Sequence, residues 1–402
     1  MKEAINIMKA KDILTFKTGK LDSNAAEDNG KYPFFTCSQE TYWINSYAFD
    51  TECVLLAGNN AAGVFPLKYY KGKFNAYQRT YVIEPKNRNV LDIRYLYYYL
   101  RPLLTAFQQQ ATGATTKFLT LKILNNLDVR VPELDIQRKI ASILSAYDDL
   151  IENNKRRIAL LEKMAEEIYR EWFVRFRFPG YQNAEFVKGI PKGWGEIHLE
   201  DFCEKVTDGT HDTPKPVSDG YYLVTGKNIK NSQISFEGAY FISGADHNEI
   251  SKRSGLKEWD ILFSNIGTIG ETAIVGNKPN YSVKNVIIFR PKNCFQSIFL
   301  AHVLKNPAIV DQFLLMASGA SQQFIGLGVA RGFKILNPSE KLISQYGEKV
   351  LPLWEQIKTL QTTNDNLRAT KVMLLPRLIS GKLSVADLDI QFPPSMMDNE
   401  AA

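Results

Sequence analysis

The chain has 402 residues, of which 45% are hydrophobic and 23% charged, and this composition excludes a disordered or fibrous protein. Its 49 Lys and Arg against 43 Asp and Glu give a formal net charge of +6, which permits nucleic-acid binding without establishing it. No run of about 18 uncharged apolar residues occurs and Met1 to Lys11 is charged, so we expect a cytoplasmic protein without a membrane span or signal peptide.

The first predicted element is a globular segment, residues 1–133. Short β-branched and aromatic runs, such as Cys53–Leu56 and Arg79–Ile83, alternate there with Gly, Asn and Pro clusters, which predicts an α+β domain with a mostly β core. A long helix follows over 134–178, because apolar residues from Ile140 to Trp172 recur at alternating steps of four and three.

A linker, residues 179–192, leads to a second globular segment over 193–338 and a second long helix over 339–385, whose seam runs from Tyr346 to Leu378. Pro376 near its end favours an early end or a kink. We expect residues 386–402 to form a flexible tail.

The two halves of the chain are similar to each other. Ala111 to Pro132 aligns without a gap onto Ala317 to Pro338, 206 residues later, and the helical seams keep the same offset. We therefore predict a pseudo-two-fold internal repeat, with two homologous mostly-β domains separated by two long helices.

Neither long helix can bury its apolar stripe alone, so we expect the two helices to pair, and an antiparallel coiled coil is our choice over a parallel one. An antiparallel register brings Asn154 and Asn364 face to face, where they would fix the pairing. The alternative is that each Asn faces solvent or another helix.

Motifs for catalysis and metal binding are lacking. The four Cys and four His are scattered without metal-ligand spacing. Gly58 to Gly63 has the glycine spacing of a P-loop, but Val64-Phe65 follow in place of Lys-Ser/Thr. Glu84-Pro85-Lys86 is too short to indicate a nuclease, and neither Asn306-Pro307 nor Asn337-Pro338 has the aromatic residues of an amino-methyltransferase. We expect a protein that is no enzyme and needs no cofactor.

The layout and several short motifs resemble the DNA-specificity (S) subunits of type I restriction–modification systems. The motifs are Ile168–Phe173, Gly189–Trp194, Asp208–Pro214, Thr225–Ile229 and Leu374–Leu383. The resemblance implies two target-recognition domains that each bind half of a bipartite, asymmetric site in double-stranded DNA. It also implies helices that set the spacer and dock two methyltransferase (M) subunits, restriction (R) subunits that join them, and cofactors that belong to those partners. The first domain departs from the pattern, since it lacks the Asp-Gly-Thr-His stretch.

Polar and basic residues on loops are the candidates for DNA contact. In the first domain they are Lys17, Lys20, Asn59, Thr115, Thr116 and Lys117, and in the second Thr207, Thr210, His211, Lys227, Asn228, Asn265, Ser321 and Gln322. The loops Gly113–Thr116 and Gly319–Gln322 rank highest. The alternative for each residue is a turn residue or a solvated lysine, and His211 could bond its own loop.

The helix ends offer a possible partner surface. Tyr169, Trp172, Leu375 and Leu378 are candidates for binding a partner helix that would complete a bundle, and the alternative is that they pack against the neighbouring domain. Phe173 to Phe178 is interpreted as an extended linker with one buried face rather than a nucleic-acid stacking surface. For the whole chain, the competing interpretation is a protein–protein scaffold with two recognition domains on a helical rod.

Overall fold

A computed structural model describes residues 6–60, 63–111, 116–319 and 322–396. The chain divides into two compact units: the first comprises Met1–Arg156 and Gln361–Ala402, and the second Arg157–Leu360. Both units mix helices and strands, as expected for an α+β protein. Within the described ranges no single helix is long and apolar enough to cross a membrane, although the bent pair Cys294–Lys305 and Pro307–Leu315 together has that length and composition.

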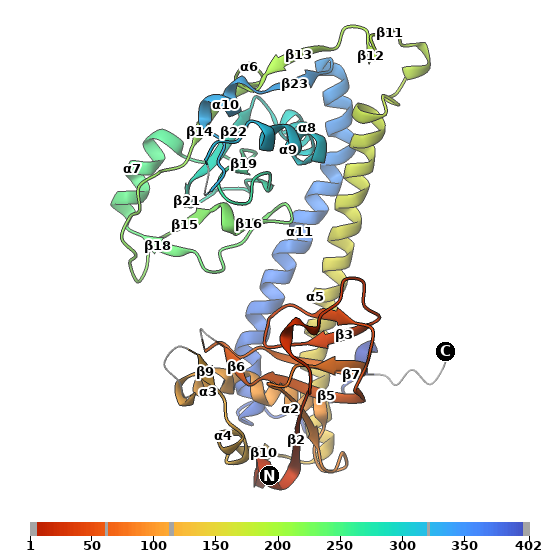
Figure 1. The fold of residues 1–402 in the computed structure, drawn as a ribbon, viewed down its shortest axis with the longest axis vertical. Coiled ribbons are helices and arrows are strands. Elements are labelled where there is room, and N and C mark those ends of the chain that lie inside the picture. The colour runs from red at the N-terminus through yellow and green to blue at the C-terminus, as the bar shows by residue number, and fades with distance from the viewer. Residues whose placement is uncertain (1–5, 61–62, 112–115, 320–321, 397–402) are drawn as a thin grey trace. The chain divides into compact units, whose positions relative to one another are not determined.

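A six-stranded sheet with the order β2-β8-β5-β7-β3-β4 forms the centre of the first unit (Figure 1). Its strands are β2 (Leu14–Thr18), β3 (Tyr32–Phe35), β4 (Tyr42–Ile44), β5 (Phe49–Ala57), β7 (Leu67–Ala76) and β8 (Thr80–Pro85). Along β5, Val54 and Leu56 face one buried cluster, whereas Cys53 and Leu55 face another. Because both faces are covered, the strand is a continuous apolar run, which explains why the sequence predicts it.

Short elements complete the first unit. They are β1 (Asn6–Lys9), α1 (Ala10–Ile13), β6 (Asn59–Asn60), α2 (Ile93–Leu100), α3 (Leu104–Gln110), β9 (Lys117–Phe118), α4 (Leu121–Asn125) and β10 (Asp128–Val131). Helix α2 begins at Asp92, whose carboxylate accepts hydrogen bonds from the backbone N–H groups of Arg94 and Tyr95, both at 2.9 Å. Its apolar side chains cover the sheet face that holds Val54 and Leu56.

The second unit is built around a four-stranded sheet, β14-β22-β19-β20, and a three-stranded sheet, β18-β15-β21. The strands are β14 (Cys203–Asp208), β15 (Tyr221–Thr225), β18 (Tyr240–Ile242), β19 (Ile261–Ser264), β20 (Thr272–Ile274), β21 (Tyr281–Lys284) and β22 (Val286–Pro291). Smaller strands are β11 (Phe186–Val187), β12 (Ile190–Pro191), β13 (Gly195–His198), β16 (Ile229–Lys230), β17 (Gln233–Ile234) and β23 (Lys334–Asn337). The helices are α6 (Leu199–Phe202), α7 (Gly244–Ser254), α8 (Cys294–Lys305), α9 (Pro307–Leu315) and α10 (Leu327–Gly332).

Two long helices, α5 (Leu134–Tyr169) and α11 (Glu340–Ile379), contribute to both units. In the first unit, Asn154 Nδ2 donates a hydrogen bond to Asn364 Oδ1 at 3.0 Å, and both side chains are buried. In the second unit, the rings of Trp172 and Tyr346 lie 5.9 Å apart. In the first unit Asp148 meets Lys371 and Asn154 meets Asn364, and in the second Ile158 packs with Ile357 and Tyr169 with Tyr346. Within each unit, later residues of α5 therefore meet earlier residues of α11. The two helices run antiparallel there, and the predicted contact between the asparagines is confirmed.

The ends of the long helices differ from the expectation. Helix α5 stops at Tyr169 and continues as a π-helical turn to Val174, and α11 passes Pro376 before ending at Ile379. Beyond the π-helical turn, Phe176 and Phe178 pack on Trp194 with ring centroids 5.5 Å away, which agrees with a linker that has a buried face.

The chain segment after α11 packs against the first unit. Lys139 Nζ donates to the Ala386 carbonyl oxygen and Ser142 Oγ to that of Gln391, both at 2.9 Å. A short 3-10 turn, Pro394–Met396, ends the described part. The segment expected to be a flexible tail is therefore packed up to Met396.

Candidate nucleic-acid interface

In the first unit, Asn59 and Lys117 come together because β6 pairs with β9, opposite residues being Asn59 with Phe118 and Asn60 with Lys117. Thr116 precedes β9 and is half-buried, whereas Thr115 lies outside the described residues. Residues 113 and 114 also lie outside the described residues, so of the predicted loop Gly113–Thr116 only Thr116 is described.

The predicted lysines of β2 and its following turn are exposed. Lys17 forms an ion pair with Glu84, its Nζ lying 3.1 Å from Oε2, and Lys20 is exposed beyond the strand. Beside β9 lies an arginine that the sequence does not single out. The guanidinium carbon of Arg79 is 5.3 Å from the Phe118 ring centroid, and the Arg79 carbonyl accepts a hydrogen bond from Gly58 N–H. Arg79 lies in the turn between strands β7 and β8, and a basic residue in a turn between two predicted strands is the sequence feature that could have identified it.

In the second unit, the segments that carry Lys227, Asn265 and Gln322 lie next to one another. A Cβ on Gly226 would lie 3.3 Å from Ser264 Cβ, and one on Gly267 would lie 3.4 Å from Gln322 Nε2. The turn at Lys227, the residues after β19 and the loop with Gln322 therefore adjoin one another. Lys227 and Gln322 are exposed, and Ser321 lies outside the described residues.

Several polar candidates of the second unit are buried instead. Asn228 accepts from Thr225 N–H through Oδ1 and donates to the Glu237 carbonyl through Nδ2, so it shapes its own turn. Thr207 and Thr210 are also buried, and Thr210 Oγ1 accepts from Asp212 N–H. Asn228 and Thr210 therefore order their own turns, and Thr207 is buried within strand β14.

His211 has a polar partner on each side of its ring, one at the start of its own loop and one in the turn between β21 and β22. Nε2 lies 2.8 Å from Asp208 Oδ2 and Nδ1 lies 3.0 Å from Asn285 Oδ1. Arg253 approaches the other oxygen of Asp208, with NH2 at 3.1 Å. This network favours the alternative interpretation, in which His211 orders the loop rather than reading a base.

Asn59 and Asn265 occupy equivalent places in the sequence, 206 residues apart; Asn59 begins β6 two residues after β5, and Asn265 directly follows β19. Asn265 Nδ2 donates to the Ile325 carbonyl oxygen at 2.8 Å. The Oδ1 atoms of both asparagines are buried without a hydrogen-bond partner in the described part of the chain. The hydrogen bond of Asn265 anchors the loop at Ile325.

The four candidates for partner binding are packed inside their own units. Tyr169 and Trp172 belong to the apolar core of the second unit, and Leu375 and Leu378 to that of the first. Tyr169 is 6% exposed and Leu378 1%, so neither offers surface to a partner, and the alternative interpretation fits them better. Apolar exposure lies elsewhere on the same helices: 62% at Leu160, 53% at Met164, 70% at Val372 and 63% at Met373.

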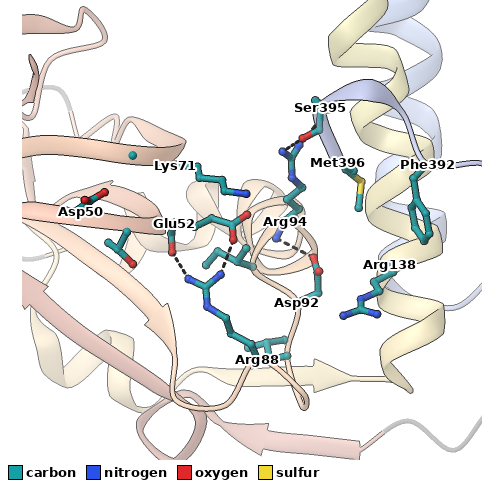
Figure 2. A pocket seen from close by; sticks show the side chains of 14 residues that line it. Asp50, Glu52, Lys71, Arg88, Asp92, Arg94, Arg138, Phe392, Ser395 and Met396 are labelled. Atoms are coloured by element: carbon teal, nitrogen blue, oxygen red, sulfur yellow. Dashed lines mark hydrogen bonds and ion pairs between the residues drawn. The ribbon is translucent and has the colours of Figure 1, made fainter. Parts of the chain in front are cut away.

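A cavity of about 770 Å³ in the first unit holds many charges (Figure 2). Arg88 NH1 pairs with Glu52 Oε2 at 2.5 Å, and the Asp92 carboxylate is occupied as the cap of α2. Figure 2 shows Arg94 reaching from α2 to Ser395, with NH1 3.2 Å from Oγ. Of these charges, Arg94 is the one that contacts the C-terminal segment, whereas Arg88 and Asp92 are paired within the globular part.

Titratable groups in the cores serve packing. Burial raises the pKa of the Cys53 and Cys203 thiols to about 12, so both stay protonated near neutral pH. Burial lowers the pKa of His302 to about 4, and its Nδ1 bonds the Ile298 carbonyl at 2.8 Å. No group of three or more His, Cys, Asp or Glu placed to hold a metal occurs among the described residues.

Comparison with known proteins adds the family. The model of the type I restriction modification DNA specificity domain matches residues 2–163. The specificity subunit of type I restriction enzyme EcoDI from Escherichia coli is 37% identical over 216 residues, which are 48% of this chain and 47% of the relative. The match therefore spans about half of that subunit's length.

Two further comparisons extend the likeness. A putative type I specificity subunit from Mycoplasma pneumoniae is 30% identical over 166 residues, 39% of this chain and 68% of the relative. The crystal structure of the S subunit of a type I restriction–modification system from M. genitalium shares the fold, with a TM-score of 0.59, 16% identity, and coverage of 94% of this chain and 96% of that one. The chain belongs to the specificity subunits of type I restriction–modification systems.

Proposed function

We propose that this chain is a non-catalytic DNA reader in which two target-recognition domains, residues 1–133 and 193–338, each bind one half of a bipartite, asymmetric site. One observation carries the proposal. The edge beside β9 in the first unit and the edge beside Gln322 in the second occupy equivalent positions, yet they present different side chains. Two related scaffolds with unlike edges suit two unlike half-sites.

A pseudo-two-fold repeat underlies this arrangement. Strand β8 of the first unit and strand β22 of the second have bounds 206 residues apart, as have β10 and β23. The same offset relates the aligned loops before β10 and β23. The antiparallel contacts between α5 and α11 in each unit support a coiled coil formed by the segments 134–178 and 339–385.

We propose that this coiled coil sets the spacer between the half-sites. Helix α5 has 36 residues, which is roughly 54 Å at ~1.5 Å per residue and at most about 16 base pairs. Half-site centres about one turn of DNA apart, on one face of the duplex, fit within that limit. Adding or removing a heptad in both helices should change the spacer, and unchanged spacing would contradict the ruler.

Two methyltransferase subunits are the proposed partners of the helices, with restriction subunits joining that core and cofactors carried by these partners. The exposed apolar pairs Leu160 with Met164 and Val372 with Met373 are better docking candidates than the buried helix-end residues. Each pair lies on a helix surface where a partner helix could pack.

The test is to map methylated bases in a host that expresses this chain with its methyltransferase subunit. We expect one asymmetric, interrupted motif, changed in one half only when loop residues of one domain are exchanged. The scaffold alternative predicts no motif. A duplex-binding assay separates the two as well, because DNA affinity of the complex should fall steeply between about 50 and 200 mM salt.

A further inference from the structure

A charged side chain lies in the apolar seam of α11 within the first unit. Lys371 is 7% exposed, and its ammonium group pairs with Asp148 Oδ1 of α5. Burial lowers the pKa of Lys371, and the neighbouring Asp148 opposes that shift. An ammonium group so placed needs its carboxylate partner, because an uncompensated buried charge is costly.

A third element completes the cluster. The Tyr98 hydroxyl, on α2 of the globular part, donates to Asp148 Oδ2 at 2.7 Å and lies 3.1 Å from Ser145 Oγ. The Lys371 ammonium group lies 5.0 Å from the Tyr98 ring centroid, where the ring face attracts a cation. Both carboxylate oxygens of Asp148 are thus engaged, one by each neighbour.

The equivalent cluster of the second unit is apolar. At the offset of 206, Tyr98 corresponds to Leu304, Asp148 to Trp354 and Lys371 to Ala165. Those three residues all pack in the apolar core of that unit. The charges thus belong to one α5–α11 contact and not to its counterpart.

Pairing a helix with a copy of itself would separate the charges. If α5 paired with α5 of a second chain in the same register, Asp148 would meet Ala165. If α11 paired with α11, Lys371 would meet Trp354. Only α5 against α11 brings Asp148 to Lys371, and the buried hydrogen bond between Asn154 and Asn364 has the same requirement.

We propose that Asp148 and Lys371, supported by Tyr98, are specificity-determining residues that make α5 and α11 partners of each other and reject like-with-like pairing with a second copy of this chain. A symmetric dimer built on like helices would display the same domain twice. By rejecting such a dimer, the contact favours a reader with two different domains. Only this consequence rests on the proposed function, the reading of an asymmetric site.

Charge reversal in the full-length chain tests the contact without DNA. We expect D148K and K371D each to lower the urea midpoint of unfolding by about 1 M. The double variant D148K/K371D should recover part of that loss, because the exchanged charges attract each other again while the contacts of both groups with Tyr98 are lost. E152K and R368D make the same charge changes at exposed positions of the same helices and should change the midpoint little. A double variant no more stable than the singles would overturn the proposal.

Moving the charge tests the partner choice. In A165K/K371A, an α5–α5 pair between two chains would hold two ion pairs, each between Asp148 of one chain and the introduced lysine of the other. We therefore expect the mass of A165K/K371A, measured by light scattering, to be double that of K371A. An equal mass for the two proteins would overturn the proposal. Should A165K/K371A fail to fold, the recovery in D148K/K371D decides. Neither readout depends on DNA binding, so their failure is distinguishable from failure of the proposed function.

Discussion

Asn265 offers a sharp test because its two amide atoms are treated differently by the fold. Nδ2 donates to the Ile325 carbonyl oxygen, whereas Oδ1 is buried without a hydrogen-bond partner in the described ranges. Asn265→Leu removes the unpaired Oδ1 but deprives the Ile325 carbonyl of its donor. One orphaned acceptor replaces another, each costing about 1–3 kcal/mol, so the free energy of unfolding should stay within about 1 kcal/mol of wild type.

Asn265→Asp keeps the shape of the asparagine side chain, but we expect it to destabilise the protein strongly. The carboxylate replaces the donor by an acceptor facing the Ile325 carbonyl and adds a buried charge, so we expect a loss of about 3 kcal/mol or more. Urea unfolding of the full chain, followed by tryptophan fluorescence, measures both variants. Asn277→Asp, at an exposed position, is the matched control and should change stability by less than about 0.5 kcal/mol. Equal stabilities for N265L and N265D would refute the hydrogen-bond reasoning.

Further predictions concern charge, pH and partners. Asp260 is fully buried and accepts from Arg290 Nε at 2.7 Å, so Asp260→Asn should lower the unfolding free energy by about 3 kcal/mol in urea titrations. The pKa of His302 is about 4 in the folded state and near 6.5 in the unfolded state, so the unfolded state takes up the proton first as the pH falls. The free energy of unfolding should therefore drop by ~3 kcal/mol from pH 6.5 to pH 4. His302→Leu should lack this component of the pH profile. Lys227→Ala should weaken DNA binding of the complex about equally for all sequences and reduce the salt slope by about 1, whereas a change of preferred sequence would contradict a phosphate contact. Met164→Asp should reduce association with the methyltransferase subunit in a mass-shift assay without lowering the unfolding midpoint, and unchanged association would move the docking site elsewhere.

The helices were predictable from the sequence because their pattern is local. A seam with steps of four and three fixes which residues of each helix face inward, and an antiparallel register then brings Asn154 to Asn364. The Asp148–Lys371 pair escaped the same reasoning. Asp148 stands one residue past the seam position Tyr147, so its contact with Lys371 depends on side-chain reach and on Tyr98 from a distant segment.

Loop residues were harder to assign, because the same polar types both bind ligands and build turns. The sequence offers Asn228 as a candidate for base contact, yet its side-chain amide bonds the backbone on both sides of its own turn. Lys227 next to it is exposed, and only three-dimensional packing separates the two roles. Likewise, Tyr169 and Leu378 belong to helix seams that continue beneath the globular parts, where sequence periodicity alone does not tell a buried end from an open one.

The packed segment from Ser380 to Met396 affects the order in which the two units can fold during synthesis. The second unit is contiguous, Arg157–Leu360, and can close as soon as those residues leave the ribosome. The first unit needs Gln361 onward, including the Ser380 carbonyl that accepts from Arg130 at 2.7 Å, so the part synthesised earliest is completed last. Premature stop codons late in the reading frame should therefore damage the earliest-made unit and spare the one in the middle.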